Sequence, residues 1–180
     1  MNKIKIRNYQ IFSIIFIFLL GSLLHFTYNI SGQNQIVAIF SSINESVWEH
    51  LKLLYFPMLL TIIIGWFYLD LDKEIPNFLC AKTIGVIISI MFTVIFFYTY
   101  SGVLGKNIAI IDITSFFIST VLGEFIAYLL MINRFKCNNK VYKFILIIIF
   151  VLFIIFTYYT PKLGIFKNPV TANYGIIDKK

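Results

Sequence analysis

Five long apolar segments alternate with short polar segments along the chain. Each is long enough, or nearly so, to cross about 30 Å of hydrocarbon at about 1.5 Å per residue of helix. The pattern predicts transmembrane helices over residues 9–30, 46–69, 79–100, 108–132 and 142–159. Neither an internal repeat nor a linker is visible. The expected fold is therefore an all-α polytopic bundle that forms a single integral membrane domain over residues 1–180.

The composition agrees with a membrane protein. Hydrophobic residues make up 59% of the chain and charged residues only 13%, whereas soluble domains carry about 25% charged residues. The net charge is +7, but Lys and Arg gather between the apolar segments, where such residues orient helices in the bilayer. We therefore expect the lipid bilayer as partner and no nucleic acid, while a homo-oligomer remains open.

The distribution of basic residues predicts that the N-terminus is inside and the C-terminus outside. This arrangement places nine Lys and Arg on the cytoplasmic side and six outside, and the short, dense segment from Arg134 to Lys143 carries most weight. The composition is typical of an AT-rich bacterial genome, so the predicted location is the bacterial cytoplasmic membrane. Cys80 and Cys137 fall in cytoplasmic segments without metal-type spacing, and the sequence predicts no disulfide between them.

Most ionisable residues within or next to the apolar segments fall at the predicted extracytoplasmic helix ends. An ionisable side chain in hydrocarbon costs at least about 2–3 kcal/mol, so each must face protein or water. The ionisable residues concerned are His25, Glu45, Glu49, His50, Lys52 and Asp112, and the polar Asn29 lies near them.

A metal site or an acid–base pair is one explanation of this group. His25, Glu49 and His50 are the predicted ligands of a divalent metal such as zinc, with Asp112 in support and Asn29 and Glu45 nearby. Structural explanations stay open. Ser46 and Glu49 match a capping box, His25 can hydrogen-bond to a neighbouring helix, and Asp112 can complement a helix dipole.

Glu124 lies deeper in the predicted membrane. Thr120, Glu124 and Tyr128 share one helix face, so the sequence predicts partners for the carboxyl on its own helix. Its role is either a neutral structural hydrogen bond or a step on a proton path. Small residues form two further stripes, which predict that the third and fourth helices pack together: Gly85, Ser89 and Thr93, and Ser115, Ser119 and Gly123.

The tail over residues 160–180 contains two prolines and two glycines among apolar residues. This pattern predicts an ordered, turn-rich extracytoplasmic segment that folds back over the outer helix ends. A disordered tail is the alternative.

The chain resembles two known families. His25, the Asn44–His50 segment followed by Leu-Lys-Leu and Pro57, and the Asn168-Pro and Tyr174-Gly pairs resemble a family of small multi-pass bacterial membrane proteins of unknown function. That resemblance covers nearly the whole chain and implies no activity. His25-x-x-x-Asn29 and Glu45-x-x-x-Glu49 also resemble, in reversed order, motifs of CAAX-protease-like intramembrane proteases, although the paired Glu and the Arg are missing.

Three functions follow as hypotheses. The first is a membrane-embedded hydrolase or transferase that acts on a lipid or lipid-linked substrate through the outer cluster. The second is a structural or accessory membrane protein whose polar groups tie helix ends and tail together. The third is a small proton-coupled transporter that uses Glu124.

Overall fold

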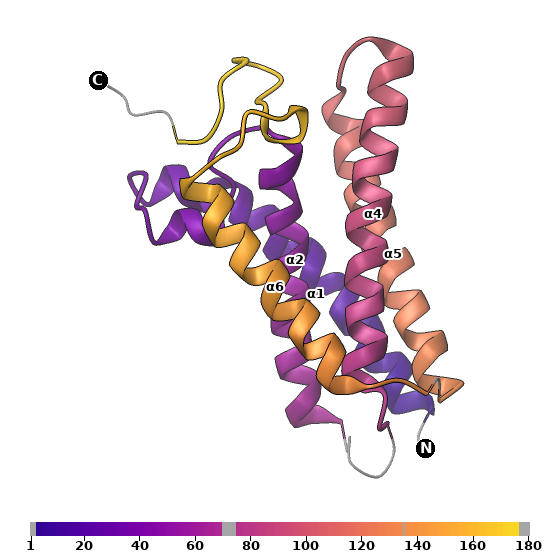
Figure 1. Ribbon diagram of the computed structural model, residues 1–180. Helices are drawn as coiled ribbons and strands as arrows, with labels where there is room; N and C mark the ends of the chain where they lie inside the picture. Colours follow the sequence, from indigo (N-terminus) through magenta and orange to yellow (C-terminus); the bar gives the residue numbers. More distant parts are fainter. Residues whose placement is uncertain (1–2, 70–74, 135, 177–180) are drawn as a thin grey trace.

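The computed structural model describes residues 3–69, 75–134 and 136–176, and within these ranges the fold is all-helical (Figure 1). Five long helices are joined by short segments, and one turn of 3-10 helix lies between the first two helices while another follows the last. The elements are α1 (Lys3–Ile30), η1 (Val37–Ile39), α2 (Val47–Tyr68), α4 (Phe78–Leu104), α5 (Ala109–Ile132), α6 (Asn139–Tyr158) and η2 (Gly164–Phe166).

All five helices are long and apolar enough to span a membrane, which confirms the predicted polytopic helical fold. Their outward faces carry large apolar side chains such as Ile15, Leu23 and Phe125, as contact with lipid requires. The N-terminus and the yellow C-terminal segment lie at opposite ends of the bundle, as an odd number of spans demands (Figure 1). The largest difference from the predicted bounds is that α1 begins at Lys3 rather than at Tyr9.

Helices α4 and α5 form a closely packed hairpin through the predicted small residues. A Cβ added at Gly85 would lie 2.6 Å from the carbonyl oxygen of Gly123, so only glycine permits this approach. One stripe also hydrogen-bonds to the other, because Ser89 Oγ donates to the carbonyl oxygen of Ser119 at 2.8 Å. The predicted packing of these two helices is confirmed.

Helices α1 and α2 meet at Gly21. A Cβ there would lie 2.5 Å from the carbonyl oxygen of Leu53. Pro57 lies inside α2 and has no N–H for that carbonyl, four residues before it. Glycine therefore lets α1 cover a backbone oxygen that its own helix leaves without a donor.

A buried ion pair joins α4 to α5 in the half of the bundle that contains the N-terminus. Lys82 Nζ lies 2.7 and 2.6 Å from the two carboxylate oxygens of Glu124, and both side chains are fully buried. The Tyr9 ring of α1 lies 5.1 Å from the same ammonium, and Gln10 Nε2 donates to the backbone oxygen of Glu124 at 2.7 Å. The partner of Glu124 is thus on α4, and the expectation of a partner on its own helix was wrong.

The C-terminal segment, residues 159–176, packs onto the start of α2 and the end of α6. Phe166 is buried, and its ring centroid lies 4.8 Å from that of Trp48 on α2. Asn44 Nδ2 donates to the carbonyl oxygen of Gly175 at 3.1 Å, which ties the segment to the connection before α2. The rest of the predicted tail, residues 177–180, lies outside the described residues.

Cys80 and Cys137 are joined by a disulfide, so the sequence-based expectation of separate thiols was wrong. The two residues are 57 positions apart in the chain, but their Cα atoms lie 6.5 Å apart because the segment before α6 returns to the start of α4. Asn139 reinforces this contact, since its Nδ2 donates to the carbonyl oxygen of Pro76 at 2.6 Å.

We predict that Gly123→Ala destabilises the bundle by about 1–3 kcal/mol, the usual range for overpacking. The new methyl group would overlap Ser89 Oγ and force α4 and α5 apart. Gly102→Ala is the matched control, because a Cβ at that position of α4 meets no atom within 4 Å. Thermal unfolding in detergent, followed by circular dichroism, would contradict the prediction if both variants melted alike.

We also predict that Glu124→Gln lowers the stability by about 3–5 kcal/mol, because it leaves the ammonium of Lys82 buried without its counter-charge. Replacing both residues by methionine removes the pair as a unit and restores much of the loss. The same unfolding measurement decides the outcome. Equal losses in the single and the double variant would show that the pairing itself contributes nothing.

Candidate functional site

The segment between α1 and α2 is fixed to α1 before it reaches the start of α2. Ser41 Oγ accepts from the backbone N–H of Tyr28 at 2.9 Å and donates to the carbonyl oxygen of Leu24. At the other end, Asn44 Oδ1 accepts from the N–H of Ser46 at 2.8 Å, and Ser46 caps α2 by accepting from the N–H of Glu49. These contacts place Glu45 next to the last turns of α1.

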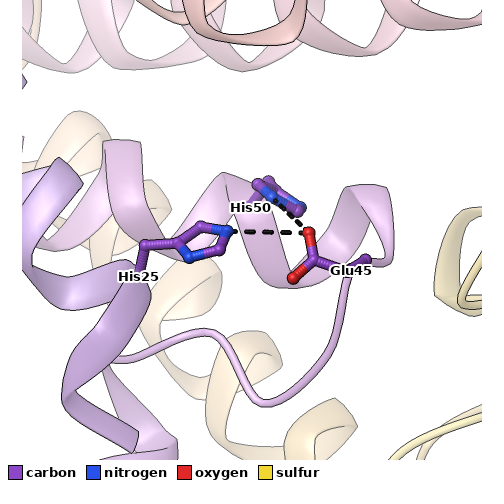
Figure 2. Close-up of side chains that lie close together, drawn as sticks. All are labelled: His25, Glu45 and His50. Atoms are coloured by element: carbon purple, nitrogen blue, oxygen red, sulfur yellow. Dashed lines mark ion pairs between the residues drawn. The ribbon is translucent and has the colours of Figure 1, made fainter. Parts of the chain in front are cut away.

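His25, Glu45 and His50 come together at this point (Figure 2). The carboxylate Oε2 of Glu45 lies 3.6 Å from His25 Nε2 and 3.5 Å from His50 Nε2. One nitrogen or oxygen from each residue lies within 4.8 Å of the other two. The three side chains are partly exposed, so a small ion or water has access to them.

A hydrogen bond to the backbone fixes the orientation of the His50 ring. Its Nδ1 lies 2.9 Å from the carbonyl oxygen of Ser46, one turn earlier in α2. Because a carbonyl oxygen only accepts, Nδ1 carries a proton, and in the neutral ring Nε2 then presents a lone pair. That lone pair faces the carboxylate of Glu45. Two acceptors face each other here, and a proton, a metal ion or a bridging water between them would remove their repulsion.

The two distances from Glu45 to the histidines match the dimensions of a transition-metal site. Ligands bound tetrahedrally at about 2.0–2.2 Å from zinc lie about 3.4 Å from one another. The distances of 3.5 and 3.6 Å around Glu45 are close to this value. Two imidazoles and one carboxylate also leave a fourth position free, which is the arrangement of catalytic zinc sites. The backbone bond to His50 is the kind of outer contact that orients metal-binding imidazoles.

The electrostatics favour an ionised carboxylate at Glu45. The hydrogen bond with His25 lowers the pKa of Glu45 below its ordinary value, while partial burial opposes this shift. Glu45 is therefore negatively charged at neutral pH and available to a cation.

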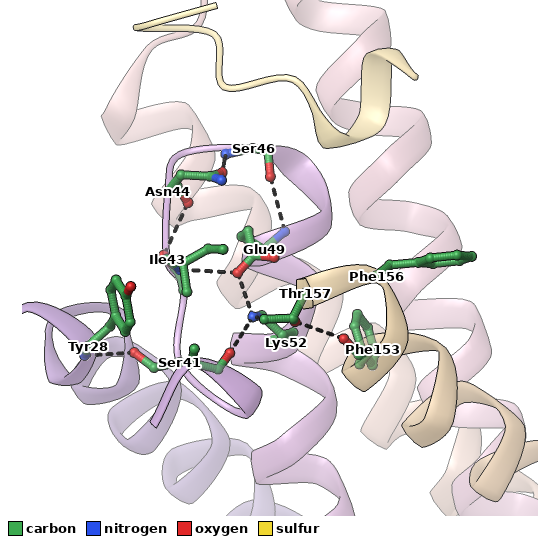
Figure 3. Close-up of polar contacts among 12 residues, drawn as sticks. Tyr28, Ser41, Ile43, Asn44, Ser46, Glu49, Lys52, Phe153, Phe156 and Thr157 are labelled. Carbon is green, nitrogen blue, oxygen red and sulfur yellow. Dashed lines mark hydrogen bonds and ion pairs between the residues drawn. The ribbon is translucent and has the colours of Figure 1, made fainter. Parts of the chain in front are cut away.

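Glu49 belongs to a separate network of ion pairs and hydrogen bonds (Figure 3). Its carboxylate lies 2.5 Å from the ammonium of Lys52 and accepts from the N–H of Ile43 at 3.1 Å. Lys52 Nζ also donates to the carbonyl oxygen of Ala38 at 2.7 Å and to Thr157 Oγ1 of α6 at 3.1 Å. Both charged side chains are buried. Glu49 thus ties three parts of the chain together, and Glu45 takes the position beside the histidines that the sequence analysis assigned to Glu49.

A cavity of about 380 Å³ opens beside the cluster, between α1, α2 and the α4–α5 hairpin. His25, Glu45 and His50 line it together with Asp112. The hydroxyl of Tyr100 donates a short hydrogen bond to the Asp112 carboxylate, which holds the side chain at the cavity wall. Asp112 also interacts electrostatically with His50.

Two other residues singled out in the sequence lie elsewhere. Asn29 is exposed, one helical turn beyond His25, and is not among the residues lining the cavity. Glu124 is paired with Lys82 in the other half of the bundle. Tyr100, near the end of α4, joins the site through its hydrogen bond to Asp112, a contact that the sequence did not predict. The catalytic and metal-binding roles of the cluster residues stay predictions.

Comparison with known proteins gives a family but no activity. A family of unknown function (DUF6512) matches residues 1–176. No curated protein and no solved structure matches the chain.

We predict that the two glutamates respond differently to removal of their charge. Glu49→Gln leaves Lys52 buried without a counter-charge and costs about 3 kcal/mol or more of unfolding free energy. Glu45→Gln alters a half-exposed group and changes the stability by less than about 1 kcal/mol. Thermal unfolding of the purified variants in the same detergent tests this difference, and a larger loss for Glu45→Gln would contradict it.

Proposed function

The chain belongs to a family of unknown function (DUF6512), and we propose that it is a membrane-embedded, metal-dependent hydrolase. His25, Glu45 and His50 hold a divalent transition metal such as zinc. The observation that carries this proposal is the convergence of one carboxylate and two imidazole nitrogens, with His50 oriented by a backbone bond, at the wall of a cavity.

The chemistry follows from the ligand set. A metal with three protein ligands keeps a position for water and lowers the pKa of that water, so a nucleophile is available at neutral pH. The same metal polarises a carbonyl or phosphoryl oxygen of the substrate. The cavity beside it has room for part of a small molecule, since ligand pockets commonly measure about 300–1,000 Å³.

Asp112 is the group that supports this chemistry from the opposite wall. It is a carboxylate held by Tyr100 at the first turn of α5, and it faces the same cavity. We assign it the handling of the proton that the attacking water releases.

The predicted orientation places this cluster at the extracytoplasmic face of a bacterial cytoplasmic membrane. Lys82 and Lys52, which were counted on opposite sides, are both buried in ion pairs. When Lys82 is left out of the cytoplasmic count and Lys52 out of the outside count, the cytoplasmic side still carries more Lys and Arg. The ends of α1 and α2 that carry the histidines then face the outside, and the Cys80–Cys137 disulfide lies at the cytoplasmic ends of the helices, where such bonds are uncommon.

We predict near-stoichiometric zinc in the wild-type protein purified in mild detergent without a metal-affinity step. His25→Ala and His50→Ala each lower the zinc content at least about tenfold, because each removes a ligand. Elemental analysis of protein dialysed against trace zinc provides the measurement. Asn29→Ala is the matched control, since it changes an exposed residue on the same helix face and keeps the metal.

Folding has to be monitored in the same samples. Monodisperse elution and unchanged helical circular dichroism separate the loss of a ligand from the loss of the fold. Wild-type protein that binds no zinc, cobalt or manganese under these conditions would refute the metal site.

A further inference from the structure

The cavity has a closed floor and an open side. Its floor is made by Gly21, Leu53 and Phe116, where a side chain on Gly21 would touch both of the other residues. Below the floor, Phe18 of α1 packs on Phe116 and Phe117 of α5, with ring centroids 5.9 and 5.4 Å apart. Helices α1 and α5 are therefore in contact below the floor and enclose space above it.

The open side of the cavity lies between α1 and α5 and faces the outside of the bundle. Four exposed residues line the cavity on this side: Ser22 and Phe26 of α1, and Ala109 and Ile113 of α5. These four residues belong to helices long and apolar enough to span the membrane. The opening between α1 and α5 thus borders on hydrocarbon, whereas Glu45 and Asn107, in connecting segments, line the end nearest the water.

The cavity changes character along its length. Leu53, Leu54 and Phe97 give it apolar walls, and the histidines, Glu45 and Asp112 occupy the polar end. Such a gradient matches an amphiphile that keeps its chain in the bilayer and its polar linkage at the membrane surface.

The charge of the residues that line the cavity favours a carboxylic ester over a phosphate group in the lipid. None of the described residues that line the cavity is Lys or Arg, while Glu45 and Asp112 are carboxylates. Phosphate groups are usually bound by Arg or Lys, which are absent from this lining. A carboxylic ester carries no charge and presents a carbonyl oxygen that a metal can polarise.

We propose that a membrane lipid enters this cavity sideways between α1 and α5 and that its carboxylic ester is hydrolysed at the cluster. The hydrolytic part rests on the metal-dependent activity proposed above, whereas the chain-binding part does not. Water oxygen bonds to the acyl carbon, the bond from that carbon to the alcohol oxygen breaks, and a proton from the water goes to the alcohol. The products are a fatty acid and an alcohol, without an oxidant or a further reactant.

The test measures binding of two probes with the same chain, 1-oleoylglycerol and 1-oleoyl lysophosphatidate, to purified protein in nanodiscs. We expect tighter binding of 1-oleoylglycerol, because its head carries no phosphate. Ile113→Trp places a bulky side chain in the opening and lowers the affinity of the protein for 1-oleoylglycerol at least about tenfold. Ile110→Trp is the matched control, since Ile110 is equally apolar and exposed on the same helix but lies outside the cavity lining.

A second pair of variants protects the test against misfolding. Ser22→Trp closes the opening from the α1 side, and Leu23→Trp adds the same bulk at an exposed neighbour outside the lining. The proposal requires both opening variants to lose the probe while both controls keep it. Equal binding by all four, or a preference for the lysophosphatidate, would overturn it.

Release of oleate from 1-oleoylglycerol by the zinc-loaded protein tests the ester assignment. We expect release by the wild type and by Ile110→Trp and a loss of at least about tenfold in Ile113→Trp. Zinc-loaded protein that binds the probe but releases no oleate would overturn the ester assignment. Protein that binds the probe but no zinc would instead refute the metal-dependent function, so the two failures are distinguishable.

Discussion

Charged groups inside a bundle that spans hydrocarbon must find partners within the protein, because no water is there to solvate them. Two ion pairs meet this requirement, one in each half of the molecule. Lys82 and Glu124 join α4 to α5. Lys52 and Glu49 hold the connection before α2 and the end of α6, through Ala38 and Thr157. Because Glu49 is committed to Lys52, Glu45 is the carboxylate that remains for the histidines.

The Lys82–Glu124 ion pair also helps to explain where the cavity lies. The Gly85–Gly123 contact and the Lys82–Glu124 pair make the α4–α5 hairpin a tight unit, and Gln10 fastens that unit to α1 near the N-terminal end. At the other end, α4 and α5 lean away from α2 and α6 (Figure 1). Packing that is tight at one end and divergent at the other leaves space between the helices beside His25 and His50.

The sequence predicted the elements better than the contacts between them. Five spans and the α4–α5 packing followed from apolar length and from small-residue stripes, which are local properties. The grouping of polar residues at one end followed from the same periodicity. The choice of Glu45 over Glu49 did not, because it depends on Lys52, which looked like an ordinary charge at a helix end. The partner of Glu124 and the Cys80–Cys137 disulfide were missed for a similar reason, since chain spacing alone does not reveal contacts between distant segments.

The start of α2 serves structure and site at once. Ser46 caps the helix through its side chain, and its carbonyl oxygen accepts from His50 Nδ1. Asn44 holds the N–H of Ser46 and reaches the carbonyl oxygen of Gly175 in the C-terminal segment. The capping residues therefore set the direction in which His50 Nε2 points and the distance at which Glu45 meets it. A cap explains Ser46 and Asn44 completely, but it provides no reason for two imidazole nitrogens to converge on the same carboxylate oxygen from different helices. That convergence is the geometric basis of the proposed metal site, and a cavity of about 380 Å³ lies beside it.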